Sequence, residues 1–347
     1  MKSGVKMKKT VRLSDIAERL QVSTVTVSNA LAGQKGVSEE LRTRIKQVAA
    51  EMGYQTRASA PAGGKKIYNI GVIIGEKYLG PYPSYYWKVY QELSLIAGLH
   101  SCVILFEVLR HEREEALELP LFAAEQQIQG LIIIGEISRA YLEFLKGQPD
   151  MPMVMVDFTM KGIACPSVMA DNYYGMYKMV NYLIDQGHRE IAYVGTLLAS
   201  NSITDRYFGY RKALLENGLE LNRDWVIDDR TMEGQIGNIR LPEKMPTAFA
   251  CNCDLTASEL VNLLKEKGYR IPEDISIVGF DNYLYEGLCD VKITSYEVDI
   301  KEMVRCAVKI VVSLAERGCA PSDMRVVSGT VVEKESVRNL LTEDKMI

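Results

Sequence analysis

The stretch VSTVTVSNALAGQKGVS, residues 22–38, decides how the first part of the chain folds. Five of its first six residues are β-branched, and β-branched residues prefer strands to helices. Both flanking segments, however, have apolar residues at helical spacing and capping residues where a helix would begin. We therefore predict a helix inside this stretch, because the neighbouring segments outweigh the local preference.

The segments around this stretch have the pattern of three short helices. In the first, the apolar residues recur at the spacing of one helical face: Leu13, Ile16, Ala17 and Leu20. Ser23 is placed to cap a second helix that Gly33 and Gly36 end, and Ser38 to cap a third that Gly53 ends. A short break between the first two helices predicts a helix-turn-helix, a motif that places its second helix in the major groove of DNA.

This region resembles the DNA-binding head of the lactose-repressor/galactose-repressor (LacI/GalR) family. The matching elements lie at fixed spacing: Asp15-Ile16-Ala17, Val22-Ser23, Thr26-Val27-Ser28, Leu31, Gly33, Val37-Ser38 and Met52-Gly53-Tyr54. By that resemblance, three residues would read base edges: Thr24, Val25 and Asn29. Three others would contact phosphates or cap the helix: Ser23, Thr26 and Ser28. Family members often have Arg where Asn29 stands, and Asn favours adenine, so the operator sequence does not carry over.

Charge is divided unevenly along the chain. Residues 1–66 carry 13 Lys or Arg and 5 Asp or Glu, a formal charge of +8, whereas the remaining residues carry 28 and 40, or −12. A basic first part of this kind indicates a partner that is an acidic polymer.

The segment QTRASAPAGGKK, residues 55–66, departs from the family pattern. The resemblance implies a hinge helix whose Leu wedges into the minor groove, but this segment has no Leu, and Pro61 and the paired glycines disfavour a helix. We expect either no hinge helix or one that binds without intercalation, with Arg57 available for phosphates. A plain flexible tether is the alternative.

From residue 67 onward, apolar runs bounded by turns alternate with helical patterns such as 172–187 and 254–268. The expected strands are IYNIGVIIG, SCVILFEVL, GLIIIGE, PMVMVDF, EIAYVGT, TAFACNC and ISIVGFDN. This alternation predicts parallel sheets with right-handed crossovers, and the number of elements favours two lobes over one sheet.

The same family resemblance continues through this body. The segments ADNYYGMYKMVNYLIDQGHREIAYVG, DRYFGYRKAL and PEDISIVGFDN are similar to three family blocks. The resemblance implies a body of the periplasmic-binding-protein type. The expected parts are a head over 1–55, a linker over 56–66, a first lobe over 67–168 and 297–325, and a second lobe over 169–296 and 326–341.

Ligands of such folds bind beyond the carboxyl ends of the strands, between the lobes. The resemblance implies an effector site with these residues: Arg206 as the anchor of a hydroxyl or carboxylate, Asp281 as an acceptor from sugar hydroxyls, Tyr86 and Asp157 on the first-lobe side, and Cys253 where relatives often have Asn. A surface Arg, a capping Asp and a core Tyr are the alternatives. Tyr78 and Tyr82 are aromatic and carry hydroxyls, which suits sugar rings. Glycines and prolines in 230–246 argue against the helix that relatives have there.

Several classes of protein are disfavoured. The seven cysteines include no C-x-x-C pair, which predicts free thiols, and three distant histidines argue against a metal site. No apolar run approaches the roughly 20 residues of a membrane span, and no secretory signal follows the basic N-terminus, so we expect a cytoplasmic location. Nucleotide and catalytic motifs are missing, so we expect no cofactor, no metal and no enzyme activity.

We therefore predict an all-α helix-turn-helix head joined to a two-lobed α/β body with parallel sheets. The expected function is sequence-specific transcriptional repression, by a homodimer on a pseudo-palindromic operator, controlled by a small effector that is a sugar or sugar derivative. Two alternatives stay open. A stand-alone sugar-binding protein would fail to shift DNA in a gel, and an α/β sugar-phosphate enzyme would turn over sugar phosphates.

Overall fold

The computed structural model describes residues 13–31, 37–52, 66–80, 84–149, 151–231, 234–237, 239–320 and 323–341. The chain divides into two compact units, Met1–Lys66 and Ile67–Ile347. The expectations about Gly33, Gly36, Gly53, Tyr82 and the segment 56–65, which includes Arg57, lie outside the described residues.

The described part of the first unit contains three helices: α1 (Leu13–Leu20), α2 (Thr24–Leu31) and α3 (Glu39–Glu51). Their buried core consists of Ile16, Ala17, Val27, Ala30, Ile45 and Ala49. Both predicted caps are confirmed, because Ser23 Oγ accepts from the amide of Thr26 at 3.0 Å and Ser38 Oγ from the amide of Leu41 at 3.4 Å. The β-branched stretch is therefore helical: Val27 is fully buried in this core, so tertiary packing outweighs strand propensity.

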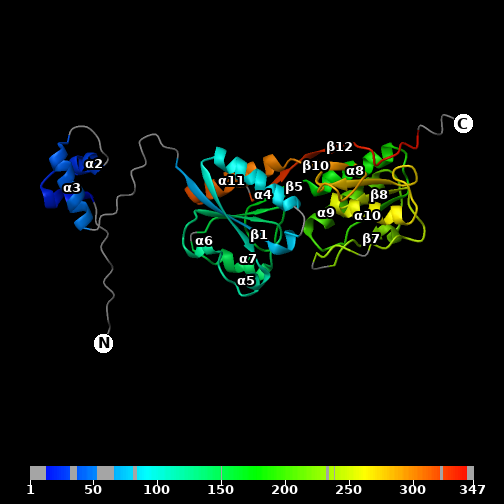
Figure 1. Ribbon diagram of the computed structural model, residues 1–347, viewed down its shortest axis with the longest axis horizontal. Coiled ribbons are helices and arrows are strands. Elements are labelled where there is room, and N and C mark those ends of the chain that lie inside the picture. The colour runs from blue at the N-terminus through cyan, green and yellow to red at the C-terminus, as the bar shows by residue number, and fades with distance from the viewer. Residues whose placement is uncertain are drawn as a thin grey trace. The chain divides into compact units, whose positions relative to one another are not determined.

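In the second unit, the described residues form two six-stranded sheets (Figure 1). The first has the order β11-β5-β4-β3-β1-β2 and is parallel throughout. Its strands are β1 (Tyr68–Gly75), β2 (Cys102–Leu109), β3 (Gly130–Ile134), β4 (Met153–Val156), β5 (Ser167–Ala170) and β11 (Met324–Val327). In the register, Val72 of β1 lies opposite Phe106 of β2 and Ile132 of β3.

The second sheet has the order β12-β10-β9-β8-β6-β7 and is parallel except for the β10–β12 pair. Its strands are β6 (Ile191–Val194), β7 (Val226–Ile227), β8 (Ala248–Cys251), β9 (Ser276–Phe280), β10 (Thr294–Val298) and β12 (Gly329–Val332). The fold class is thus as predicted, and all seven expected strands are present.

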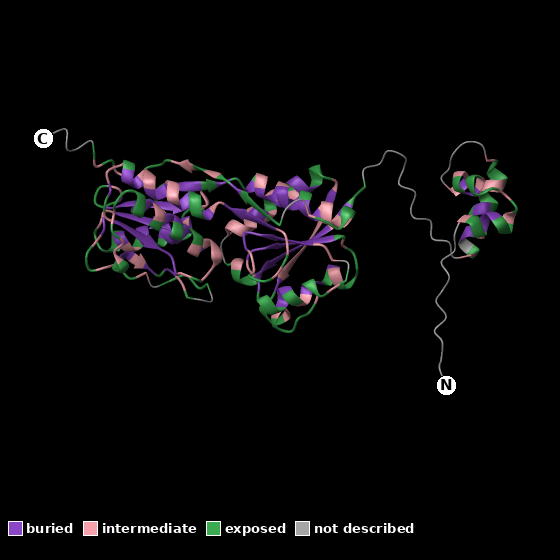
Figure 2. Ribbon diagram, turned by 180° about the vertical axis from the view of Figure 1, so that it is seen from behind, coloured by how far each residue is buried: buried purple, intermediate pink, exposed green. Residues whose placement is uncertain are grey.

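Helices cover both faces of each sheet. On the first sheet, α4 (Tyr85–Leu99) and α11 (Ile300–Arg317) pack on the face that Val154 and Val156 share, and α7 (Arg139–Lys146) packs on the face of Met153 and Met155. The short elements are η1 (Glu76–Tyr78), α5 (His111–Glu115), α6 (Leu121–Ala124) and η2 (Arg223–Trp225). Alternate residues of a strand thereby enter different cores, and Figure 2 shows the strands largely buried.

On the second sheet, α8 (Asn172–Asp185) and α9 (Asn201–Glu216) cover one face and α10 (Asp254–Glu266) the other. Gly209 permits the close packing of α8 on α9, because a Cβ there would lie 2.1 Å from the carbonyl oxygen of Tyr173. This contact explains the glycine in the DRYFGYRKAL block. In the described part of 230–246 there is no helix, and Arg230 instead pairs with Ile236 in a β-bridge.

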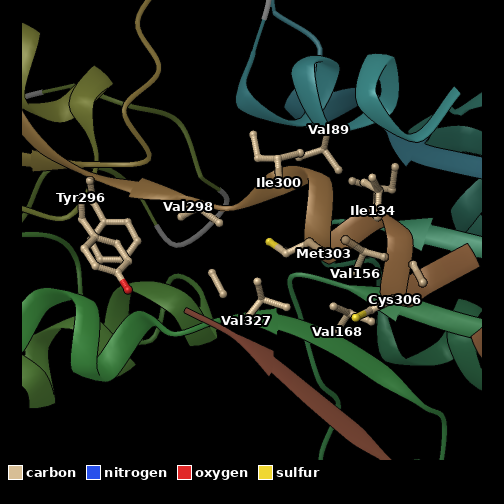
Figure 3. Close-up of a cluster of buried hydrophobic side chains, with 14 of the residues drawn as sticks. Val89, Ile134, Val156, Val168, Tyr296, Val298, Ile300, Met303, Cys306 and Val327 are labelled. Atoms are coloured by element: carbon tan, nitrogen blue, oxygen red, sulfur yellow. The ribbon is translucent and has the colours of Figure 1, made fainter. Parts of the chain in front are cut away.

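The chain crosses between the lobes three times: after β5, between β10 and α11, and between β11 and β12. One hydrophobic core continues across these crossings, from Tyr296 and Val298 in β10 to Ile300 and Met303 in α11 (Figure 3). The two lobes are therefore parts of one folded unit.

Candidate functional site

The carboxyl ends of the parallel strands carry the predicted polar residues. Asp157 directly follows β4, Asp281 directly follows β9, and Cys253 lies two residues past the end of β8. Asp157 and Asp281 have positive φ angles of 65° and 92°, which are costly for residues other than glycine. Backbone strain of this kind clusters at binding and catalytic positions.

Arg206 lies at the centre of the second-lobe cluster, and each of its side-chain nitrogens has an acceptor. Nε donates to Oδ1 of Asn172 at 2.8 Å, Nη1 to the carbonyl oxygen of Asn252 at 2.5 Å, and Nη2 to Oδ1 of Asp281 at 3.1 Å. The guanidinium also lies 3.8 Å from the centroid of the Phe280 ring. Arg206 is only 4% exposed, so it fixes the arrangement of three neighbouring segments besides offering its remaining N–H groups.

Charges from both lobes act on one another in this cluster. Burial acts to lower the pKa of Arg206, but the carboxylates of Asp281 and Asp157 outweigh burial and raise it, so the guanidinium keeps its charge. Burial raises the pKa of Asp157 from 3.8 to about 6, against the opposing effect of Arg206. Asp157, from the first lobe, is thus within electrostatic range of a second-lobe ion pair.

The first-lobe side of the cluster is aromatic. The hydroxyl of Tyr86 donates to Oδ2 of Asp157 at 3.0 Å, and burial raises the pKa of Tyr86, which keeps that proton in place. The ring of Tyr86 packs edge-on against Tyr78 and Tyr85, with centroids 4.6 and 5.6 Å away. The hydroxyl of Tyr78 in turn donates to the carbonyl oxygen of Glu136 at 3.1 Å.

Cys253 lies at the N-cap of α10 and is partly exposed. Its Sγ is 3.3 Å from Oγ1 of Thr256 and 3.7 Å from Nη2 of Arg230. Three of the five predicted residues of the body, Asp157, Cys253 and Asp281, follow strand ends, whereas Tyr86 and Arg206 lie in α4 and α9. Hydrogen bonds directly join two pairs of them, Tyr86 with Asp157 and Arg206 with Asp281.

A second arginine network was not predicted. Arg230 donates to both carboxylate oxygens of Asp229, to Oδ1 of Asn252 and to Oγ1 of Thr256. Asp229 is fully buried; burial acts to raise its pKa, but the bonds from Arg230 and Thr256 outweigh burial and lower it. The run Asp228-Asp229-Arg230 does follow a strand, but β7 has only two residues, too few for an apolar pattern to identify.

The sequence did not predict a site role for Asn172 either. It is the first residue of α8, is 2% exposed, and supplies an acceptor to Arg206.

A cavity of about 320 Å³ lies beside the segment that follows Asp281. It is lined chiefly by residues 282–293, together with Asp254 and Lys334. None of the five predicted residues lines this cavity.

In the first unit, α2 presents three exposed residues to solvent: Thr24, Val25 and Ser28. Asn29 is partly exposed, and Val25 is 65% exposed although it is apolar. The hydroxyls of Ser23 and Thr26 are 2.8 Å apart, so these two residues form a cap at the start of the helix.

Across the described ranges, no group of three or more His, Cys, Asp or Glu residues is arranged to hold a metal ion. In the same part of the chain, no helix has both the length and the apolar character that crossing a membrane requires.

Comparison with known proteins gives two family matches. Residues 12–57 match the bacterial regulatory proteins of the lacI family, and residues 180–337 match a periplasmic binding protein-like domain. The transcriptional repressor CytR of Escherichia coli (strain K12) is 26% identical over 337 residues, which cover 94% of this chain and 96% of that protein. The repressor PurR of Histophilus somni (strain 129Pt) is 28% identical over 279 residues, 78% of this chain and 82% of that protein.

Solved structures show the same fold. A lac repressor dimer bound to operator and the anti-inducer ONPF has a TM-score of 0.64 at 20% identity, covering 95% of this chain and 100% of that one. A complex of the transcriptional regulator CelR with cellobiose has a TM-score of 0.65 at 19% identity, covering 94% and 99%.

A helix-turn-helix unit followed by a two-lobed α/β body defines a transcription regulator. The chain belongs to the LacI family of bacterial regulatory proteins. It is a DNA-binding transcriptional repressor, and its relatives are repressors and not enzymes.

Proposed function

We propose that the repressor binds a pseudo-palindromic operator as a homodimer and that α2 of each head reads the major groove. The exposed side chains of Thr24, Val25 and Ser28 support this role, because short side chains let a helix backbone approach base edges. Asn29 would hydrogen-bond adenine, and Val25 would contact a thymine methyl group. Ser23 and Thr26 act chiefly as the cap, because their hydroxyls bond to one another.

A gel shift with the full-length chain tests this proposal. Asn29→Ala should weaken specific binding, whereas Ser14→Ala, an exposed change on α1, should leave it unchanged. A protein that begins at Ile67 should lose DNA binding altogether. With about 6–10 phosphate contacts, the slope of log K against log salt should be about −5 to −9. Specific binding by the shortened protein, or a flat salt dependence, would contradict the proposal.

Exposed apolar residues on the first lobe support the homodimer. Leu95 and Leu99 of α4 are 68% and 76% exposed, and Val103 of the edge strand β2 is 48% exposed. Three large apolar side chains on adjacent elements suit a surface that another copy covers. Leu99→Glu should therefore produce monomers in light scattering, while Leu215→Glu, an equally exposed change on α9, should not.

We further propose that a sugar or sugar derivative binds between the two lobes and controls operator affinity. The observation that carries this proposal is the cluster of Asp157, from the first lobe, with Arg206 and Asp281, from the second. Carboxylates and guanidinium groups hydrogen-bond sugar hydroxyls, and the tyrosine rings beside them suit an apolar sugar face. CelR, a structural relative, is known in complex with cellobiose.

An effector held by both lobes would favour one arrangement of the lobes over others and so change the relative placement of the two heads. A thermal-shift screen over sugars and sugar phosphates tests the effector proposal, since a ligand that binds the native state raises its stability. Arg206→Lys should reduce the shift and leave operator binding intact. The proposal fails if no sugar or sugar phosphate stabilises the protein.

A further inference from the structure

In the polar cluster around Arg206, two buried side-chain atoms lack a hydrogen-bond partner among the residues that the structure describes. They are Nδ2 of Asn172 and Oδ1 of Asp157. Asn172 is 2% exposed and Asp157 is 6% exposed. Buried polar atoms are almost always hydrogen-bonded in native proteins, so an unpaired donor and an unpaired acceptor together call for an explanation.

The identities of these two atoms are fixed by their neighbours. Arg206 Nε can only donate, and it donates to Asn172, so the Asn172 atom that faces Arg206 is the oxygen and the free atom is the amide nitrogen. Tyr86 donates to Oδ2 of Asp157, and the backbone amide of Ala170 also stabilises this carboxylate, but Oδ1 itself has no partner at hydrogen-bond geometry.

The two residues lie at the same edge of one sheet. Strands β4 and β5 are parallel neighbours in which Val156 pairs with Val168. Asp157 directly follows β4, and its amide donates to the carbonyl oxygen of Val168 at 2.8 Å. Asn172 follows β5 by two residues and opens α8. The free donor and the free acceptor are thus placed at the ends of adjacent strands, both beside Arg206.

We propose that Asn172 is an effector-binding residue and that, with Asp157, it recognises a hydroxyl group of a neutral polyhydroxylated effector. This inference rests on the effector site proposed above. A hydroxyl both donates and accepts, so a single hydroxyl can donate to Oδ1 of Asp157 and accept from Nδ2 of Asn172. Two neighbouring hydroxyls can also make one of these hydrogen bonds each. A keto oxygen cannot donate to Asp157. A phosphate cannot donate when fully ionised and is repelled by the carboxylates of Asp157 and Asp281.

Exchanging the donor and the acceptor tests this pairing. Asn172→Asp keeps an oxygen for Arg206 but turns the free donor into an acceptor, and Asp157→Asn turns the free acceptor into a donor. Each single change should weaken binding about tenfold or more, because one buried group then faces a group of its own kind. The double variant has one donor and one acceptor again, in exchanged places, and should recover affinity to within about threefold of the wild type.

The measurement is calorimetric titration of the full-length protein. The probe is whichever of D-glucose, D-ribose and cellobiose gives the largest thermal shift, with D-glucose 6-phosphate as the anionic comparison. The matched control is Asn181→Asp, the same change on the same helix but bonded to Asn217 outside the cluster, and it should leave affinity unchanged. In Asn172→Asp two acceptors face the ligand. The affinity of this variant for D-glucosamine, relative to D-glucose, should therefore be higher than that of the wild type.

The outcomes separate the two proposals. If D-glucose 6-phosphate binds and Arg206→Lys weakens it, but neither exchange variant does, the effector site stands and the hydroxyl pairing is wrong. The pairing would also be wrong if the double variant lost as much binding free energy as the two single variants lose together. So would a crystal structure of the complex in which only a water contacts the two atoms. If no sugar or sugar phosphate of the thermal-shift screen binds the wild type, the effector proposal and this inference fail together.

Discussion

The substitution Asp157→Asn should make the repressor progressively more stable than the wild type as pH rises. Burial raises the pKa of Asp157 from 3.8 to about 6 in the folded protein. Between these two values the folded chain binds a proton that the unfolded chain has released, so the free energy of unfolding of the wild type falls as pH rises. Asparagine does not titrate, so the variant lacks this loss.

The magnitude follows from the pKa difference. A shift of roughly two units costs the wild type about 3 kcal/mol once both states are ionised, near pH 7.5, and about half of that near pH 5. The advantage of the variant should therefore grow by about 1.5 kcal/mol between these pH values. The buried amide nitrogen that the variant introduces costs about 1–3 kcal/mol, but this cost does not change with pH. The slope, rather than the absolute difference, is the test.

Urea unfolding of the full-length protein, followed by circular dichroism at several pH values across this range, measures the slope. Asp185→Asn, an exposed change on α8, is the matched control and should run parallel to the wild type. Parallel curves for Asp157→Asn and the wild type would refute the reasoning. The same variant should bind effector more weakly, since ligand sites commonly give up stability for binding.

Three other outcomes are expected. Arg206→Ala should lower the free energy of unfolding by about 3–5 kcal/mol in urea titrations, because it leaves Asp281 buried without its partner. A variant that loses the effector response but keeps its full stability would contradict the observed network. Ser23→Ala should destabilise the head by about 1 kcal/mol in thermal melts, while Ser28→Ala should change gel shifts and not the melting temperature. In a circular-permutation gel shift the operator should bend less than with wedge-bearing relatives; a sharp bend abolished by Pro61→Ala would oppose this.

Much of the fold could be predicted because long apolar runs belong to strands buried on both faces. Five of the described strands lie outside the expected runs, and all five are short: β5, β7, β10, β11 and β12. In β11 three of the four residues are exposed, and β7 is only two residues long, so neither produces an apolar run. β5 and β10 are largely buried, but they have four and five residues and include Ser or Thr, so no long apolar run marks them either. The helix α2 could be predicted against its β-branched residues only because the caps and the neighbouring periodicity were considered with it.

The site could be predicted in part, for a related reason. Asp157 and Asp281 end recognisable strands, and the resemblance pointed to Arg206. What the sequence could not indicate is that all three nitrogens of Arg206 are already bonded within the protein. Asn172 became a candidate only because the structure leaves its amide nitrogen unpaired, and such an imbalance has no sequence signature.

The last crossing between the lobes has a genetic consequence. Only residue 328 separates β11, an edge strand of the first sheet, from β12, an edge strand of the second. A stop codon ahead of residue 324 would therefore remove a strand from both sheets at once, although it spares the helix-turn-helix and all the preceding strands. Nonsense alleles that abolish repression should accordingly extend as far as the codons for residues 324–332, instead of thinning out once the helix-turn-helix has been encoded.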